Sequence, residues 1–266
     1  MISIVMPLYN SERFLADAID SVLNQSFSDW ELLICDDGST DNSYRLASKY
    51  SKKDARIVLL KNNLTKGASG ARNTCIKHAR GRYIAFLDSD DLWHHNKLEV
   101  QLKHMKKNQI GFSYGNYYNI SESDKKINIV KSPQHISFHS MLLSNWVGCL
   151  TVMIDRNYFS DIEQPFIQRR NDYALWLTLL KQLKPQKFSG IDNILGFYRV
   201  NNYGLSSQKF SALQSYYTCI RTYGDRGILK SLFMTQIYLC IMLIKKIFPR
   251  AYNQMVIPLV ERFANK

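Results

Sequence analysis

Short apolar runs alternate with amphipathic stretches over the first hundred residues of the chain. The apolar runs are rich in β-branched residues and are typical of buried parallel strands, which are expected at residues 2–6, 32–35, 57–60 and 83–87. Between them, apolar residues recur at helical spacing, most regularly over residues 14–23. This alternation predicts right-handed crossovers and an α/β fold, in which helices flank a Rossmann-like, doubly wound, mostly parallel sheet.

The pattern is less regular after the first hundred residues. Helices are expected at residues 97–107 and 172–183. Strands are expected at residues 111–119, 127–130 and 150–154. The order of these elements does not by itself say how the second half of the chain joins the sheet.

A change of pattern near residue 205 divides the chain. We expect one domain at residues 1–204, with a first half at residues 1–105 and a second half at residues 106–204. Long helical patterns then predict a C-terminal helical extension at residues 205–266. Its apolar run LFMTQIYLCIMLI has thirteen residues, which is too short to span a bilayer comfortably, and is followed by two lysines. Such a run is typical of an interfacial membrane helix, and equally of a helix packed on the body of a protein.

The net charge of +13 favours an anionic partner, such as a phosphate-bearing small molecule, a nucleic acid or an acidic membrane surface. The basic residues are not gathered on one predicted helix and the most distinctive loop is acidic, so no nucleic acid is expected. Five scattered cysteines without CxxC spacing argue against a disulfide framework and a zinc site. These cysteines, together with the lack of a basic leader in the sequence, predict a cytoplasmic protein.

Three aspartates directly follow the fourth predicted strand, in the segment IAFLDSDDLW. Carboxylates this close repel one another, so a bound cation would stabilise the group. Asp88 and Asp90 are expected to point into one cleft, where they can hold Mg²⁺ or Mn²⁺. A metal at this place neutralises charge on a departing diphosphate. The alternative is an acidic loop that faces water.

Polar segments also follow the first and second strands, and they project with the aspartates at the carboxyl edge of the sheet, where ligands bind. Pro7 lacks an N–H group and is expected to end the first strand. Tyr9 offers a ring on which a base can stack, and Asn10 can cap the next helix. Asp37 can accept a hydrogen bond from a pyrimidine or a ribose. Arg72, in LTKGASGARN, can bind a phosphate or a ribose.

Five segments match one family pattern in order and spacing: IVMPLYN, SVLNQSFSDWELLICDDGSTDNS, GASGARN, GRYIAFLDSDDLW and KLE. Over about residues 2–105 the chain resembles the nucleotide-sugar-binding half of glycosyltransferase family 2, which has the GT-A fold. The resemblance implies inverting transfer of a sugar from a nucleoside diphosphate donor, most often a UDP-hexose, with a Mn²⁺ or Mg²⁺ cofactor. It implies that Asp88 and Asp90 bind the metal. The implied nucleotide-sugar-binding residues are Pro7, Tyr9, Asn10, Asp37, Arg72, Asp88 and Ser89.

The second half resembles the same family more loosely, over about residues 146–209. The family has an acidic general base at the start of a helix, and the segment RRNDYALWL places Asp172 at that position, after Asn171. The resemblance implies that Asp172 takes the proton from an acceptor hydroxyl. An aspartate in a first helical turn also suits the helix dipole. Arg199, in a YR pair, is expected either to hold the diphosphate or to be structural.

The QxxRW motif of processive polysaccharide synthases is absent from the sequence, so one sugar is expected per encounter. With the basic, apolar tail, the chain is similar to bacterial enzymes that build surface polysaccharides, such as O-antigen or capsule, on a lipid diphosphate carrier. This implies a lipid-linked saccharide acceptor and a peripheral position on the inner face of the cell membrane. The alternatives are a sugar nucleotidyltransferase, whose glycine-rich loop is replaced here by PLYN, and a non-catalytic nucleotide- or membrane-binding protein.

Overall fold

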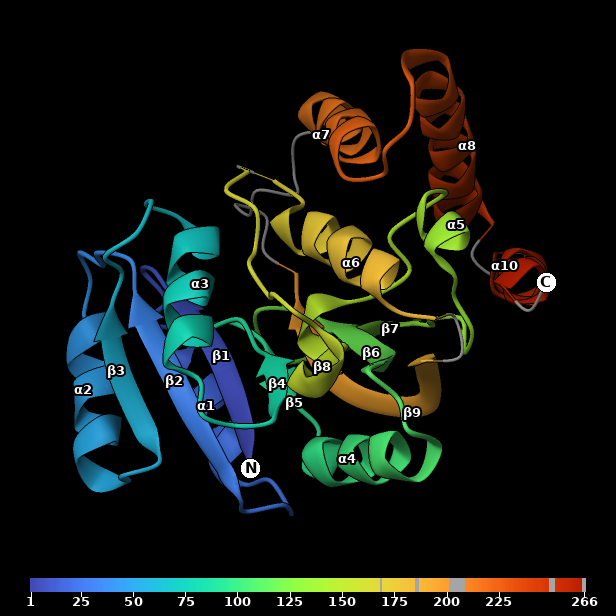
Figure 1. Cartoon of the computed structure of the whole chain (residues 1–266). Helices are drawn as coiled ribbons and strands as arrows, with labels where there is room; N and C mark the ends of the chain where they lie inside the picture. Colours follow the sequence, from blue (N-terminus) through green and yellow to red (C-terminus); the bar gives the residue numbers. More distant parts are fainter. Residues whose placement is uncertain (168, 185–186, 201–208, 249–251, 265–266) are drawn as a thin grey trace.

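The described strands form one sheet with helices on both faces, and further helices follow toward the C-terminus (Figure 1). The computed structural model describes residues 1–167, 169–184, 187–200, 209–248 and 252–264. The expected domain boundary, at residues 204 and 205, lies outside these residues.

The first half of the sheet consists of four parallel strands in the order β3–β2–β1–β4. They are β1 (Ile2–Leu8), β2 (Trp30–Asp36), β3 (Ile57–Lys61) and β4 (Tyr83–Phe86). The four buried strands that the apolar runs predict are confirmed, as is the doubly wound order of this half. Parallel strands covered on both faces have few polar positions, which is why nearly continuous apolar runs identify them.

The second half of the sheet is mixed. From β4 it continues through β8 (Met153–Asp155), β6 (Phe112–Ile120), β9 (Phe188–Arg199) and β5 (Leu92–Trp93), with β7 (Lys126–Val130) on β6. β6 and β9 are parallel, whereas β8, β5 and β7 pair antiparallel to their neighbours. The strand expected at residues 150–154 is divided, because a 3₁₀ turn, η1 (Cys149–Thr151), precedes β8.

Two hydrophobic cores cover the two faces of the parallel half. Along β1, Ile4 and Met6 join one core and Val5 joins the other, since alternate residues of a strand point to opposite faces. The core of Ile4 contains residues of α1 (Leu15–Leu23), α2 (Ser43–Lys53) and α4 (Lys97–Asn108). The core of Val5 contains residues of α3 (Ala68–His78) and α6 (Asn171–Gln182).

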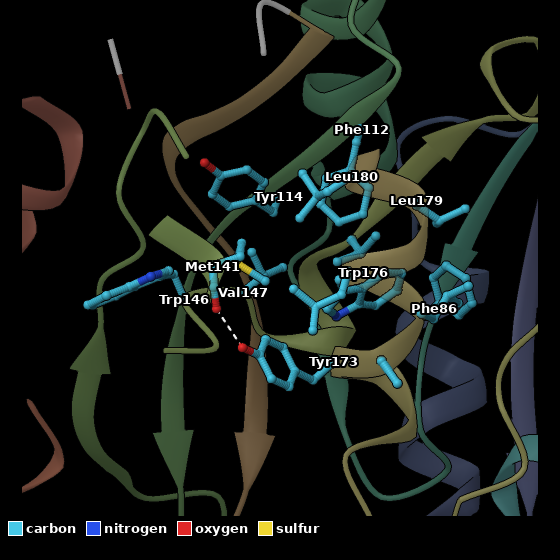
Figure 2. Packing of buried hydrophobic residues seen from close by; sticks show 14 of the residues in the cluster. Phe86, Phe112, Tyr114, Met141, Trp146, Val147, Tyr173, Trp176, Leu179 and Leu180 are labelled. Carbon is cyan, nitrogen blue, oxygen red and sulfur yellow. Dashed lines mark hydrogen bonds between the residues drawn. The ribbon is translucent and has the colours of Figure 1, made fainter. Parts of the chain in front are cut away.

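Trp176 anchors α6 at the centre of the larger core (Figure 2). Its ring lies edge-on to Phe86 of β4 and Phe112 of β6, with ring centroids 5.2 and 5.3 Å away. Nearly one turn earlier, the Tyr173 hydroxyl donates a hydrogen bond of 2.5 Å to the carbonyl of Met141. These contacts fix the position of the first turn of α6 relative to β4.

Of the C-terminal helices, the first two lie on the outer side of α6, and the last packs beside the short helix α5 (Phe138–Met141) (Figure 1). The C-terminal helices are α7 (Lys209–Thr222), α8 (Ile228–Ile247), η5 (Tyr252–Val256) and α10 (Ile257–Ala264), and the short helix η2 (Arg156–Tyr158) lies, like α5, earlier in the chain. Tyr216 of α7 and Tyr238 of α8 belong to the same core as Trp176.

Candidate active site

The loops after β1, β2 and β4 meet at one edge of the sheet. The hydroxyls of Ser11 and Ser89 share a hydrogen bond of 2.7 Å, which joins the loop after β1 to the loop after β4. The N–H of Ser11 donates to Ser43 Oγ at 2.8 Å, which joins the loop after β1 to the start of α2. The expectation that these segments project at the same carboxyl edge is confirmed.

Pro7 does not end β1, contrary to the expectation from the sequence. The pairing of β1 with β2 continues through Pro7 to Leu8. The pairing with β4 ends at Val5, whose carbonyl accepts a hydrogen bond of 3.1 Å from the N–H of Leu87. Since strand residues alternate in bonding direction, the missing N–H of Pro7 falls on the side of β4, where no pairing is lost.

Tyr9 and Asn10 lie on the exposed rim of this edge. Tyr9 is 50% exposed, and the Lys66 ammonium lies 5.5 Å from the centroid of its ring. Asn10 does not cap the next helix, because α1 begins only at Leu15. Its backbone is left-handed, with φ 46°, and its side-chain oxygen accepts a hydrogen bond of 2.8 Å from the N–H of Thr40. Asn10 therefore ties together the loops after β1 and β2.

The two aspartates before Gly38, Asp36 and Asp37, form different hydrogen bonds and have different structural roles. Asp36 is buried and accepts a hydrogen bond of 3.2 Å from the N–H of Gly38, which closes the turn. Asp37 accepts hydrogen bonds of 2.6 Å from Asn62 Nδ2 and 2.8 Å from the N–H of Gly67. Gly67 has φ 118°, which a residue with a side chain rarely adopts. Asp37 therefore holds the start of α3 beside the loop after β2.

The three carboxylates after β4 are not equivalent. Asp88 and Asp90 are half-buried, whereas Asp91 is buried. Asp91 accepts a hydrogen bond of 2.8 Å from the N–H of Arg199, so it faces β9. Burial raises the pKa of Asp91 well above its ordinary value, and the charges of Asp90 and Asp88 raise it further. Only Asp88 and Asp90 are accessible enough to meet a ligand.

Asp88 and Asp90 fit a divalent cation. They supply the oxygen ligands that Mg²⁺ and Mn²⁺ prefer, and they follow β4 one residue apart at the carboxyl edge of the sheet. Within the described ranges, no three or more His, Cys, Asp or Glu side chains are grouped so that they could hold a metal. The two aspartates therefore suit an ion that completes its coordination with water or with oxygens of a bound substrate.

Arg72 lies buried at the centre of the site and not on its surface. It is 5% exposed, forms an ion pair with Asp88, and donates a hydrogen bond of 3.3 Å to Asn171 Oδ1. Burial lowers the pKa of Arg72, but the carboxylates of Asp88 and Asp172 outweigh it and raise the pKa above its ordinary value. Arg72 therefore links the loop after β4 to the first turn of α6.

Asp172 lies half-buried in that first turn. Burial raises its pKa above the ordinary value of an aspartate, and the positive charge of Arg72 opposes the shift. Its neighbour Asn171 accepts a hydrogen bond of 2.8 Å from the N–H of Asp172. A carboxylate with a raised pKa suits a general base, because proton transfer is most efficient when the pKa of the base approaches the working pH.

Cys149 also lies in the site, although no motif in the surrounding sequence VGCL marks it. Its thiol is half-buried at η1. Burial raises its pKa, the positive charge of Arg72 opposes the shift, and the charges of Asp88 and Asp172 add to it. η1 packs against β4, and the adjoining strand β8 pairs with β4, so long-range packing places this thiol.

Of the two roles expected for Arg199, the structural one is favoured. The side chain is buried, and its Nε donates a hydrogen bond of 2.9 Å to the carbonyl of Asp90. Its Nη1 lies 2.6 Å from the carboxylate of Asp124. The guanidinium also lies 4.4 Å from the ring centroid of Phe14. Arg199, at the end of β9, thus stabilises the acidic loop through hydrogen bonds to Asp90 and Asp91.

Residues 3–160 match the model of the family described as Glycosyl transferase family 2, which is more than half of the chain. The chain belongs to this family. Within the family it is similar to the Escherichia coli protein named UDP-Glc:alpha-D-GlcNAc-diphosphoundecaprenol beta-1,3-glucosyltransferase WfgD. The identity is 44% over 216 residues, which are 80% of this chain and 83% of that protein.

Solved structures of low sequence identity share the fold of this glycosyltransferase. S. aureus TarS in complex with UDP-GlcNAc has a TM-score of 0.70 and 17% identity, over 90% of this chain and 71% of that chain. Mannosyltransferase PcManGT from Pyrobaculum calidifontis, solved with GDP-Man and Mn²⁺, has a TM-score of 0.66 and 12% identity, over 92% of this chain and 75% of that chain. The expected GT-A fold is confirmed.

Proposed function

We propose that this glycosyltransferase moves a single hexose from a UDP-sugar to a hydroxyl of a lipid-linked saccharide, with inversion, in the synthesis of a bacterial surface polysaccharide. The observation that carries the proposal is the Arg72 bridge, because it joins Asp88 at the edge of the parallel strands to the helix turn that holds Asp172. The name of the E. coli relative gives a UDP-glucose donor and a diphosphoundecaprenol-linked acceptor, which supports this choice of substrates.

The donor would be held by the loops after β1, β2 and β4. The proposed donor-binding residues are Pro7, Tyr9, Asn10, Asp37, Arg72, Asp88 and Ser89. Tyr9 is exposed enough to stack on a base, and Asp37 lies at the same edge for the base or ribose. Arg72 would act through Asp88, which it orients, because its own guanidinium is buried and already bound.

Asp88 and Asp90 would hold Mn²⁺ or Mg²⁺, which when bound neutralises negative charge on the donor diphosphate. Arg72 binds one carboxylate oxygen of Asp88, so the metal would use the other. The Mn²⁺ in PcManGT supports a divalent ion in this fold.

Asp172 would act as the general base. It would accept the proton of the acceptor hydroxyl while that oxygen attacks the anomeric carbon from the face opposite the diphosphate, which inverts the configuration. Arg72 pairs with Asp88 and donates a hydrogen bond to Asn171, the neighbour of Asp172, which supports a fixed relation between the proton-accepting carboxylate and the donor loops. One sugar would be added per encounter.

Purified full-length chain, incubated with Mn²⁺, a panel of nucleotide sugars and a GlcNAc-diphospho-lipid acceptor, is expected to transfer one hexose from a UDP-sugar. NMR of the product should show an anomeric configuration opposite to that of the donor. Absence of transfer from every donor would contradict the proposal. Release of pyrophosphate from UTP and a sugar 1-phosphate would instead identify a sugar nucleotidyltransferase.

We also propose that the protein is cytoplasmic and lies on the inner face of the cell membrane through α8. The helix is 20 residues long, extends beyond the apolar run at both ends, and by length and composition alone could cross a membrane. Tyr238 and Ile241 pack on the protein, while the opposite stripe of α8 is exposed. Lys230 and Lys246 lie exposed near its two ends. A one-sided apolar helix with basic flanks suits an anionic lipid surface.

Replacing Phe233 and Ile247 together by serine is expected to lower affinity for vesicles containing phosphatidylglycerol by about a hundredfold. These side chains are 62% and 60% exposed, and each large apolar side chain buried in lipid contributes about 1.5 kcal/mol or more. Vesicle sedimentation measures the affinity. Ile127→Ser, at an exposed isoleucine of β7, is the matched control and should bind like the wild type. A wild-type chain that stays in the supernatant would disprove the membrane proposal.

A further inference from the structure

Arg170, the residue that precedes α6, has an unusual backbone. Its φ of 58° and ψ of 28° lie in the left-handed region, which residues with a side chain adopt infrequently. A cation at the N-terminal end of a helix is also unfavourable with respect to the helix dipole. Two local disadvantages therefore coincide two residues before Asp172, and strained positions of this kind tend to gather at functional sites.

The side chain of Arg170 extends away from the donor loops into the C-terminal helices. Its Nη2 donates a hydrogen bond of 2.7 Å to the hydroxyl of Tyr238 in α8. The guanidinium lies 5.1 Å from the ring centroid of Tyr238 and 5.4 Å from that of Tyr216 in α7. These rings stack on each other with centroids 3.9 Å apart. Arg170 is therefore held by both α7 and α8.

The same aromatic stack reaches back to α6. Tyr173 stacks on Tyr216 with centroids 5.8 Å apart and an angle of 6° between the rings. The Tyr216 hydroxyl donates a hydrogen bond of 2.5 Å to the carbonyl of Leu142. Three rings from α6, α7 and α8, with Arg170 beside them, thus enclose the turn that contains Asp172.

The backbone of Arg170 takes part in the same turn. Its carbonyl accepts a hydrogen bond of 2.9 Å from the N–H of Ala174, and this bond forms the first turn of α6. The contacts of the Arg170 side chain with the tyrosine stack therefore restrain the backbone of the first turn, and with it the carboxylate of Asp172. Displacement of a reacting group by about 1 Å is enough to lower a rate about a hundredfold.

We infer that Arg170 is a positioning residue for Asp172, clamped by Tyr216 and Tyr238. The C-terminal helices, which lie outside residues 3–160 matched by the family model, then belong to the apparatus that orients the base. The inference rests on the proposed role of Asp172 as general base. The exposed apolar stripe of α8 lies on the side opposite Tyr238. The same helix would therefore contact the membrane with one side and hold Arg170, near the general base Asp172, with the other.

The charges around Asp172 make the inference testable by pH. Burial raises the pKa of Asp172; Arg72 from α3 and Arg170 lower it, while Asp88 from the loop after β4 raises it. The thiols of Cys149 and Cys219 and the hydroxyl of Tyr117 also lie close enough to feel its charge. Loss of the Arg170 charge should therefore raise the pKa of Asp172.

The test compares Arg170→Met, Arg170→Lys and Tyr238→Phe in the full-length chain with a UDP-hexose donor. Arg170→Met is expected to lower kcat about a hundredfold, and the other two variants about tenfold, while the affinity for UDP is unchanged. The rising limb of the kcat–pH profile should move to higher pH in Arg170→Met only, since Arg170→Lys and Tyr238→Phe keep the charge. Tyr217→Phe is the control, because that hydroxyl contacts Arg221 and not α6, and it should keep wild-type kcat.

An unchanged kcat in Arg170→Met overturns the positioning role. A loss of kcat in which the rising limb of the kcat–pH profile does not shift overturns it as well. So does a loss of UDP affinity or melting temperature equal in all variants, which would indicate general unfolding. The proposed function is tested separately by Asp172→Asn. If that variant loses turnover while Arg170→Met does not, the base assignment stands and only the clamp is wrong.

Discussion

Asp172→Asn is expected to lower the turnover of sugar transfer by about 10³-fold while the affinity for UDP stays the same. General-base catalysis by a positioned side chain contributes about 10²- to 10⁴-fold, and an amide cannot accept the proton. Asparagine keeps the volume of the side chain, so the half-buried first turn of α6 should retain its packing. Initial rates at saturating donor, with calorimetric titration of UDP, measure the two effects separately.

Asp161→Asn, at an exposed aspartate in the segment before α6, is the matched control and should turn over normally. The wild-type kcat should fall as the pH drops through the pKa of Asp172, and burial places that pKa above the ordinary aspartate value. The acidic limb should therefore lie at higher pH than for an exposed aspartate. Near-normal turnover in Asp172→Asn would show that another group removes the proton.

Asp90→Ala is expected to abolish Mn²⁺ binding in the presence of UDP and to lower turnover by about a thousandfold. A metal that stabilises charge on the leaving group contributes several kcal/mol, and each 1.4 kcal/mol corresponds to a tenfold change in rate. The variant also removes one of the charges that raise the pKa of buried Asp91. The backbone carbonyl that receives Arg199 remains in place.

Electron paramagnetic resonance of Mn²⁺ measures the binding, and thermal unfolding measures stability. Asp17→Ala, at an exposed aspartate of α1, removes the same charge at a distance from the acidic loop in sequence and should bind the metal normally. Unchanged Mn²⁺ affinity in Asp90→Ala would remove Asp90 from the proposed metal ligands. Normal turnover in a metal-free buffer would show that no divalent ion is required.

The first half of the fold was predictable because its information is local. A strand covered on both faces is apolar at most of its positions, so the runs that became β1 to β4 are visible in the sequence. Parallel strands then bring their carboxyl ends to one edge, which is why the loops with Asp37 and Asp88 could be placed together. Their chemical roles remain predictions.

The second half was less predictable because its strands pair over long separations. β8 is only three residues long, yet it lies between β4 and β6, and the 3₁₀ turn η1 just before it, which contains Cys149, packs against β4. The sequence predicts a strand close to this position, at residues 150–154, but its periodicity does not say which strands it pairs with. The sequence alone gives Arg72 and Arg199 similar possible roles, because each is an arginine in a family motif that could bind a phosphate. In the structure, Arg72 links Asp88 to α6, whereas Arg199 of β9 donates a hydrogen bond to the backbone of the acidic loop.

The sequence by itself determined the order of the elements, the acidic loop after β4 and the aspartate at the start of α6, because side-chain periodicity and strand ends are set by neighbouring residues. Only the tertiary structure decided that Arg72 joins Asp88 to a helix turn 99 positions away, and that Arg170 is held by tyrosines of α7 and α8. Those contacts depend on how distant elements pack, and packing is a property of the whole core.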